Sequence, residues 1–483
     1  MSKKLKVLIL AAEAAPFAKV GGLADIAAAL PKSLRSLDVD ARLLIPRYGT
    51  IRSEDYDFHR VGHPIPVPIG PNESRVHLLE TTIEKDVPTY LIWHEKYFSS
   101  CKEIYGFNND PQRFTFFSRA VIEVLKTLDW KPDVIHAHDW HTAPVVAWLD
   151  FYGRHEPFYR DIATLYTIHN LAYQGLAGRL LLPFARMKEL PHLPVEPPGK
   201  VSWMAQGIAH ADLVNTVSPT YAREILEPKA GMGLESLLSE REGQLFGVLN
   251  GIDTELWNPD TDSALPQTFS AETFSMRSVN KAALQREIGL QARENVPLLG
   301  MVSRLDRFKG FDILFPALQQ LLASEELQVV ILGAGEAEYE ARLRDLQAQF
   351  PSQVRVLIKF DERLARRIYG GIDIFLMPSL FESCGLSQMI AMHYGAVPVV
   401  RATGGLVDTV VDGDAQPRRG NGFAFAPFEA AALAATVQRA LVAYAQSERW
   451  QVLQQRGMEM DFSWEASART YIDLYRRALA VHG

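Results

Sequence analysis

The sequence predicts an α/β protein made of two doubly wound domains, and three observations lead to this prediction. Short apolar runs, typical of buried parallel strands, alternate with stretches of helical spacing along most of the 483 residues. The alternation stops near residue 257 and begins again after residue 270. A chain of this length also exceeds what one hydrophobic core usually supports.

In the first half, strands are expected at 6–10, 40–45, 134–138, 164–169, 213–217 and 244–248. Pro-rich, strand-like pieces between 65 and 92 predict an antiparallel excursion from the sheet. A helix is expected to open at 23–30, where Pro31 breaks or kinks it, and another at 114–125.

In the second half, strands are expected at 298–302, 329–332, 354–358, 372–377 and 397–400. Helical stretches separate them, among them 387–394. The segment 257–270 is the most plausible linker, and the tail 464–480 has the spacing of a helix.

Composition excludes several classes of protein. Fifty Lys and Arg against 57 Asp and Glu give a net charge of −7 without a long basic run, which disfavours a nucleic-acid partner. Only Cys101 and Cys384 are present, so a disulfide framework is not expected and a cytoplasmic location fits. No apolar stretch approaches the roughly 20 residues of a membrane span. The lysines at 3, 4 and 6 imitate the start of a signal peptide, but Glu13 interrupts the short apolar run.

Polar and glycine residues follow two neighbouring strands of the second half. Glu382 comes after the strand at 372–377, and Thr403-Gly404-Gly405 comes after the strand at 397–400. Ligands of open parallel sheets bind at the carboxyl ends of strands. This placement indicates a partner for sugar hydroxyls beside a phosphate cradle; an ordinary strand-end turn is the alternative.

A glycine pair recurs in the two halves. Gly21-Gly22-Leu23-Ala24-Asp25 and Gly404-Gly405-Leu406-Val407-Asp408 each open a helix. Glycines allow the backbone to approach an anion, and helix N-terminal amides carry partial positive charge. The pair of loops predicts an anion site between the domains, although chance could produce the same repeated motif.

Three cations lie close to these loops or strand ends. Lys19 precedes the first glycine pair, and Arg304 and Lys309 follow the strand at 298–302. Such cations suit a diphosphate, which Arg can bind in a bidentate manner. Solvated surface charge is the competing interpretation.

A group of histidines lies in and just after the strand at 134–138. His136, His138 and His141 with Asp139 resemble a metal cluster, but zinc needs three or four converging ligands, and strand-end histidines are more often structural, so no metal is expected. His169 ends the next strand. Asp139 and His169 are therefore expected to meet substrate hydroxyls at one edge of the sheet.

Together these motifs resemble bacterial glycogen (starch) synthase, glycosyltransferase family 5. The resemblance follows the chain in order and includes the stretch around Glu382 and Thr403. The other segments that carry it are Lys19–Asp25, His136–His141, Thr167–Gly175, Val217–Ala222, Val248–Asp253, Ser303–Leu305 and Met460–Trp464.

This resemblance implies a GT-B fold, in which two Rossmann-like domains face each other across a deep interdomain cleft. Residues 1–257 would form the acceptor and catalytic domain, with the helix 464–483 crossing back to it, and residues 258–463 the nucleotide-sugar domain. The implied reaction is transfer of glucose from ADP-glucose to the nonreducing end of an α-1,4-glucan, glycogen or starch, with retention of configuration. No metal or cofactor is implied, because ADP-glucose is a substrate.

The resemblance also implies roles for single residues. Glu382, Asp139, His169 and Asn170 would contact donor glucose or acceptor, and Phe360 would lie against the adenine. The groups at the diphosphate would be Lys19, Arg304, Lys309, Thr403 and the glycines Gly21, Gly22, Gly404 and Gly405. Cys384 would lie beside the nucleotide and is predicted to react with thiol reagents.

Some residues depart from the family pattern. Phe308 stands where Gln is common, Lys359 replaces a small residue beside the base site, and Ser383 stands where Pro is usual. These departures leave UDP-glucose open as the donor. A catalytically weak glucan-binding or regulatory protein on the same fold is the alternative function. A glucan phosphorylase is disfavoured because no pyridoxal-anchoring lysine motif is visible.

Overall fold

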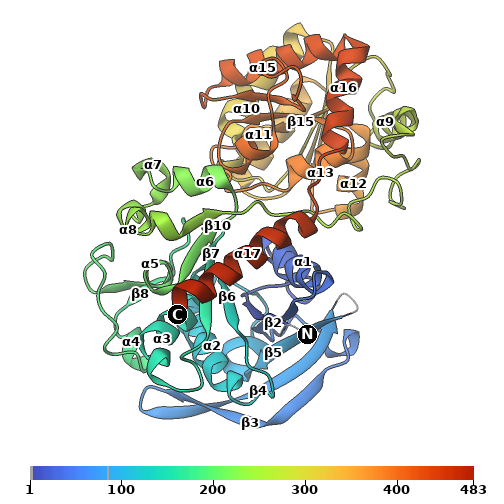
Figure 1. Ribbon diagram of the computed structural model, residues 1–483. Coiled ribbons are helices and arrows are strands. Elements are labelled where there is room, and N and C mark those ends of the chain that lie inside the picture. Colours follow the sequence, from blue (N-terminus) through green and yellow to red (C-terminus); the bar gives the residue numbers. More distant parts are fainter. Residues whose placement is uncertain (1–3, 84–85) are drawn as a thin grey trace. The chain divides into compact units, whose positions relative to one another are not determined.

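The computed structural model describes residues 4–83 and 86–483 (Figure 1). Residues 1–3 and 84–85 lie outside the described part of the chain. The first group includes Lys3 of the N-terminal lysines, and the second belongs to the predicted 65–92 excursion. The chain divides into two compact units. Unit 1 joins Met1–Gly251 to Trp464–Gly483, and unit 2 is Ile252–Ser463.

Unit 1 is built on a mixed sheet. Within the described residues its order is β11-β10-β7-β6-β1-β2-β5-β4-β3. The strands are β1 (Lys6–Leu10), β2 (Asp40–Pro46), β3 (His59–Ile69), β4 (Asn72–Ile83), β5 (Val87–Trp93), β6 (Val134–His138), β7 (Ala163–Ile168), β10 (Leu213–Thr216) and β11 (Leu245–Gly247). A separate antiparallel pair joins β8 (Leu176–Gly178) to β9 (Lys200–Ser202).

The antiparallel excursion is confirmed, with one refinement. β3 pairs antiparallel with β4, and β4 antiparallel with β5. β5 then lies parallel to β2, so the chain re-enters the parallel sheet after the two edge strands. The remaining strands from β2 to β11 are parallel, and residues on β1, β6 and β7 are almost entirely buried, as expected for strands covered on both faces.

Helices cover this sheet. The main ones are α1 (Gly22–Ser36), α2 (Asp110–Leu125), α3 (Asp139–Phe151), α5 (Trp203–His210) and α6 (Pro219–Glu224). Of the two predicted effects of Pro31, a break is wrong, because α1 continues to Ser36, and a kink stays a prediction. Ile26, Leu30 and Leu34 are buried on either side of the proline, and this packing outweighs the one missing backbone hydrogen bond.

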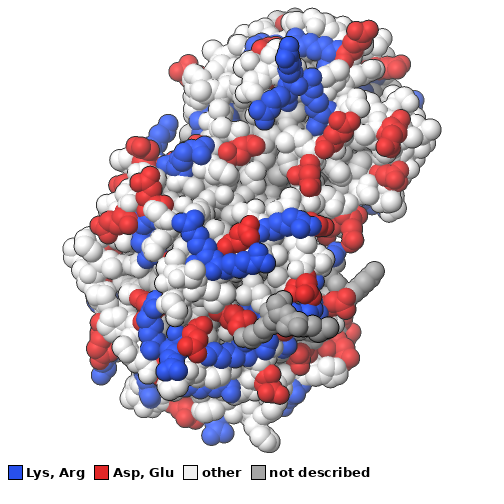
Figure 2. All heavy atoms as spheres, viewed as in Figure 1, with Lys and Arg blue, Asp and Glu red and all other residues white. Residues whose placement is uncertain are grey.

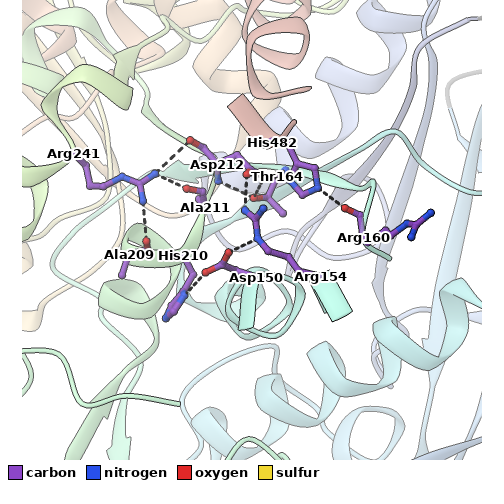
Figure 3. Close-up of polar contacts among 10 residues, drawn as sticks. All are labelled: Asp150, Arg154, Arg160, Thr164, Ala209, His210, Ala211, Asp212, Arg241 and His482. Carbon is purple, nitrogen blue, oxygen red and sulfur yellow. Dashed lines mark hydrogen bonds and ion pairs between the residues drawn. The ribbon is translucent and has the colours of Figure 1, made fainter. Parts of the chain in front are cut away.

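The C-terminal helix α17 (Trp464–His482) belongs to unit 1, where it packs on α1 and β7. Its buried residues Trp464, Ala468, Tyr471, Tyr475 and Ala478 recur at three- and four-residue spacing, which places them on one face. At its end, His482 is held by the carboxylate of Asp212 and the carbonyl oxygen of Arg160 (Figure 3).

Unit 2 is a wholly parallel doubly wound sheet. In the described residues its order is β14-β13-β12-β15-β16-β17. The strands are β12 (Leu298–Val302), β13 (Gln328–Gly333), β14 (Val354–Ile358), β15 (Ile374–Met377), β16 (Val397–Arg401) and β17 (Phe423–Phe425). The last was not predicted, because three residues between glycine-rich turns give too short a pattern. The main helices are α9 (Arg277–Glu287), α10 (Phe311–Ser324), α11 (Ala337–Gln349), α12 (Glu362–Gly371), α13 (Ser387–His393), α15 (Ala430–Tyr444) and α16 (Ser447–Met458).

The surface carries both signs of charge. On the face shown in Figure 2, Lys and Arg side chains lie beside Asp and Glu on both units. Arg439, for example, pairs with Asp412 and Asp414. In the part of the chain that the structure describes, no helix is long and apolar enough to span a membrane.

Candidate active site

Each sheet has one point at which the chain reverses the direction in which it adds strands. In unit 1 this point lies between β1 and β6, and in unit 2 between β12 and β15. At such a point the loops after the two strands separate to opposite faces and leave a crevice, where ligands of doubly wound sheets bind. Most of the predicted site residues lie in loops at or next to these two points, whereas Phe360 follows the edge strand β14.

In unit 1, three loops bring together two predicted residues and one that was not predicted. Asp139 follows β6 and His169 follows β7, and the backbone N–H of His169 donates to Oδ1 of Asp139 at 2.8 Å. Glu13 follows β1, the neighbour of β6. Asp139 and His169 thus lie together at one edge of the sheet, and their contact with substrate hydroxyls stays a prediction.

Asp139 has an unusual backbone. Its φ of 56° places a non-glycine residue in the left-handed region, at the first residue of α3. Strain of this kind persists where the surrounding structure demands it and is common at functional sites. The conformation lets the carboxylate reach back to the amide of His169.

Glu13 holds the first glycine loop. Its Oε2 accepts hydrogen bonds from the amides of Val20 at 2.6 Å and Gly21 at 3.3 Å. Lys19 and Gly22 are exposed beside them, and Nζ of Lys19 pairs with Oδ1 of Asp25 at 2.7 Å. The amide of Gly21 is therefore occupied by a carboxylate, while Lys19 remains at the surface.

Burial changes the proton affinities of this cluster. It raises the pKa of Glu13 to about 7, against the opposing effect of the two amides. It also raises the pKa of Asp139 to about 7. Burial lowers the pKa of His169 to about 3, so this imidazole is neutral at physiological pH.

In unit 2, the loops after β12 and β15 meet through an ion pair. Nζ of Lys309 lies 2.6 Å from Oε2 of Glu382, and the hydroxyl of Ser379 donates to the same oxygen at 3.3 Å. The backbone also joins the loops, because the amide of Leu380 donates to the carbonyl oxygen of Phe308 at 2.8 Å. A cation and a carboxylate are thus held at the predicted crevice.

Gly310 explains this close approach. It has a φ of 79°, and a Cβ added to it would lie 2.0 Å from the carbonyl oxygen of Pro378. Any other residue would push the loop that carries Lys309 away from the end of β15. The glycine after Lys309 therefore determines where the ammonium group lies.

Arg304 occupies the same edge but is not held there. Its side chain is 70% exposed, and its guanidinium lies 3.4 Å from the carboxylate of Asp306. A guanidinium held so loosely can reorient towards an arriving anion.

The second glycine pair packs two loops together, and its expected contact with a diphosphate stays a prediction. Gly404 has a φ of 47°, and a Cβ on it would lie 1.8 Å from the carbonyl oxygen of Glu382. The amide of Gly405 donates to the carbonyl oxygen of Ser383 at 3.2 Å. The pair packs the loop after β16 onto the loop that carries Glu382, and the amide of Gly405 is occupied. Thr403, 5% exposed, lies in the same turn.

Three other predicted residues have distinct environments. Phe360, just after β14, is 84% exposed and is available to a ligand. Asn170 follows His169, and its side-chain oxygen accepts from the amide of Ala172. Cys384 is 3% exposed beneath the 403–405 turn. Burial slows the predicted reaction with thiol reagents, because a reagent reaches the thiol only after local opening.

No three His, Cys, Asp or Glu side chains in the described chain are arranged to hold a metal ion. His136 instead lies between the hydroxyls of Tyr475 and Thr167, at 2.9 Å and 2.5 Å. His138 pairs with His169. These hydrogen bonds fit the interpretation that histidines at a strand end are structural.

Two residues were missed by the sequence reasoning, Glu13 as a loop anchor and His138 as the partner of His169. A carboxylate three residues after the first strand was a usable signal for Glu13, since it stands at the carboxyl end of a central strand. No local signal identifies the partner of His138, because the two histidines lie at the ends of neighbouring strands with a helix between them.

Comparison with protein families gives two matches. Residues 6–240 match the starch synthase catalytic domain, and residues 286–452 match glycosyl transferases group 1. Among curated proteins, the chain is 43% identical to the glycogen synthase of Geotalea daltonii, over 99% of this chain and 100% of that one. It is 44% identical to the glycogen synthase of Moorella thermoacetica, over 99% of this chain and 98% of that one.

Solved structures agree. The catalytic domain of starch synthase IV from Arabidopsis thaliana, solved with ADP and acarbose bound, superposes with a TM-score of 0.91 at 35% identity. The match covers 99% of this chain and 100% of the plant domain. Sucrose-phosphate synthase from Thermosynechococcus elongatus, at 18% identity and a TM-score of 0.62, shares the fold, with 99% and 100% of the chains covered.

Proposed function

The chain belongs to the glycogen and starch synthase family and has the GT-B fold, and from this premise we propose the reaction that it catalyses. It transfers glucose from ADP-glucose to the nonreducing end of an α-1,4-glucan, with retention of configuration. The nucleotide sugar is a substrate, and the reaction calls for no cofactor. We also propose a cytoplasmic location, in keeping with two free cysteines.

The observation that carries the proposal is the Lys309–Glu382 pair at the crevice of unit 2. Cleavage of the donor leaves extra negative charge on the departing diphosphate. Cations held in place stabilise that charge more than they stabilise the intact donor. We assign this role to Lys309, which Glu382 holds in place, and propose that the exposed Arg304 and Lys19 reorient towards the diphosphate when it binds.

Glu382 is proposed to accept hydrogen bonds from hydroxyls of the donor glucose. Its side chain is only 12% exposed and its carboxylate already accepts from Ser379 and Lys309, so it is oriented before a ligand arrives. In unit 1, Asp139, His169 and Asn170 are proposed to bind sugar hydroxyls of donor or acceptor. The neutral imidazole of His169 suits hydrogen bonding to an uncharged sugar.

Phe360 is proposed to stack on the adenine, which its exposure after β14 permits. Lys359 is tied to Asp361, with Nζ 2.8 Å from the carboxylate. Its charge is thus neutralised beside the proposed base site, and the departure from the family pattern does not by itself argue against adenine.

The experiment is incorporation of labelled glucose into glycogen from ADP-glucose and, in parallel, from UDP-glucose, with EDTA present. Incorporation from ADP-glucose is expected. Incorporation only from UDP-glucose would keep the transferase and overturn the assignment of the base. Binding of glycogen with no incorporation from either donor would favour the glucan-binding alternative.

The variant Glu382→Ala distinguishes the proposed transferase from the alternative glucan-binding protein. Loss of the carboxylate removes a sugar contact and leaves Lys309 unpaired, so transfer is expected to fall by about 10²–10³-fold, while retention on immobilised glycogen is unchanged. Glu338→Ala, at an exposed position of α11, is the matched control and should keep full activity. Equal transfer rates for both variants would contradict the role given to Glu382.

A further inference from the structure

His138 is buried directly against a proposed substrate-binding residue. It is the last residue of β6 and is fully buried. Its Nδ1 lies 2.8 Å from Nε2 of His169, and the two rings stack with their centroids 5.1 Å apart. In the described chain, Nε2 of His138 is buried and has no hydrogen-bond partner.

This arrangement determines which nitrogen carries the proton. If His169 donated from Nε2, then His138 would accept at Nδ1 and carry its own proton on Nε2. A buried N–H without an acceptor is costly, about 1–3 kcal/mol. If His138 donates from Nδ1, its Nε2 is only a buried lone pair, which costs less. The second arrangement is therefore favoured, and both rings are neutral, since burial holds both pKa values low.

We propose that His138 is a positioning residue that holds His169 as the tautomer protonated on Nδ1. His169 accepts at Nε2 from His138 and presents its Nδ1–H to a hydroxyl oxygen of the bound sugar. No partner for that Nδ1 is found among the described residues. This inference rests on the proposed function, in which His169 binds donor or acceptor sugar.

The neighbouring residues keep His138 in place. The ring of His136 packs on it, with centroids 4.1 Å apart. His136 is itself held at both nitrogens by the hydroxyls of Tyr475 and Thr167. On the other side, Asp139 binds the backbone amide of His169. Consecutive residues 138 and 139 thus hold the ring and the backbone of His169, respectively.

The first test needs no substrate. In protein labelled with ¹⁵N-histidine, the resonances of His169 are assigned by comparison with His169→Asn. We expect the chemical shift of a protonated nitrogen at Nδ1 and of an unprotonated nitrogen at Nε2. A protonated Nε2 would overturn the proposal, whether or not the protein transfers glucose.

The second test compares two substitutions. In His138→Asn, the amide nitrogen stands where Nδ1 stood and can still donate, so kcat is expected to stay within about threefold of wild type. In His138→Leu the donor is lost, and kcat is expected to fall by about tenfold or more, the effect of one buried hydrogen bond. His210→Asn, in which the amide nitrogen can likewise keep the hydrogen bond that Nδ1 makes to Asp150, is the matched histidine control and should keep kcat.

Equal losses in the Asn and Leu variants would show a purely structural role and overturn the proposal. If H138L does not fold, the comparison of H138N with wild type and the ¹⁵N result still decide it. Absence of transfer by the wild type would instead reject the proposed function and leave the tautomer assignment standing.

Discussion

At the residue scale, the cluster around Glu13 and Asp139 and the cluster around Lys309 and Glu382 each combine charged side chains with backbone hydrogen bonds between loops. Glu13 is the clearest case, because one of its carboxylate oxygens accepts hydrogen bonds from two backbone amides of the first glycine loop. Its raised pKa, about 7, is the result of burial that the amides only partly offset. The loop is thus held by a group that changes charge near neutral pH.

Glu13→Gln tests this pH dependence. The folded-state pKa of Glu13 is raised from 4.5 to about 7, so within that window the folded protein keeps a proton that the unfolded chain releases. Stability therefore falls as pH rises through the window, by on the order of 3 kcal/mol at most. Gln does not ionise, so the Tm of E13Q should gain on that of wild type between about pH 5 and pH 8.

The measurement is thermal unfolding of both proteins over this range. Glu54→Gln, at an exposed position, is the control and should follow the wild-type profile. Parallel Tm profiles for E13Q and wild type would contradict the pKa assigned to Glu13.

At the element scale, α17 is attached to unit 1 by its buried face and by its last residues. His482 has acceptors at both ring nitrogens, the carboxylate of Asp212 at 3.0 Å and the carbonyl oxygen of Arg160 at 2.7 Å (Figure 3). Only the imidazolium can donate to both. The hydrogen bond to Asp212 accordingly raises the pKa of His482 above its usual value, although burial opposes the shift.

This attachment should weaken with increasing pH. A raised folded-state pKa means that the stabilisation is complete below the unfolded pKa, near 6.5, and is lost as pH rises through the folded value. The Tm difference between wild type and His482→Gln is therefore expected to be larger at about pH 6 than at about pH 9. His155→Gln, at an exposed position, provides the control. A constant difference across this range would contradict protonation of His482.

At the scale of the whole molecule, unit 1 is assembled from both ends of the chain. Its C-terminal segment buries Tyr471, Leu474 and Tyr475, and Tyr475 hydrogen-bonds His136 beneath the proposed site. Unit 2, in contrast, is one continuous segment. The two units therefore depend differently on the last residues.

Deletion of residues 464–483 tests this dependence. Burial of each large apolar side chain contributes about 1.5–3 kcal/mol, and several such losses approach the total stability of a domain, about 5–15 kcal/mol. We expect unit 1 to lose cooperative unfolding while unit 2 keeps its own transition. Differential scanning calorimetry measures this, with Tyr475→Phe as a mild variant that removes only the hydroxyl. If both unfolding transitions survive in the deletion variant, unit 1 does not depend on the C-terminal helix and the prediction is contradicted.

Much of the fold and part of the site could be predicted from the sequence. Strands in the middle of a sheet are rich in apolar residues, so β6 and β12 were located to the residue. The half-buried edge strand β14 was also located to the residue from its apolar spacing. Asp139 and His169 follow central strands directly, Glu382 and Lys309 lie in the loops after such strands, and the position of a residue after a strand is local information. The short β17 and the continuation of α1 past Pro31 were missed, because packing rather than local pattern decides them.

The sequence alone determined which residues stand at strand ends, the order of strands and helices along the chain, and the resemblance to a transferase family. Tertiary structure alone decided which strand ends are neighbours. That choice places Glu13 under the glycine loop, turns the amide of Gly405 to Ser383, buries Cys384 and pairs His138 with His169. The physical reason is that these contacts join residues on different loops, which lie apart in the sequence and meet only in the folded chain. Strand order and the packing of loops at a sheet edge determine them, and no local pattern encodes either.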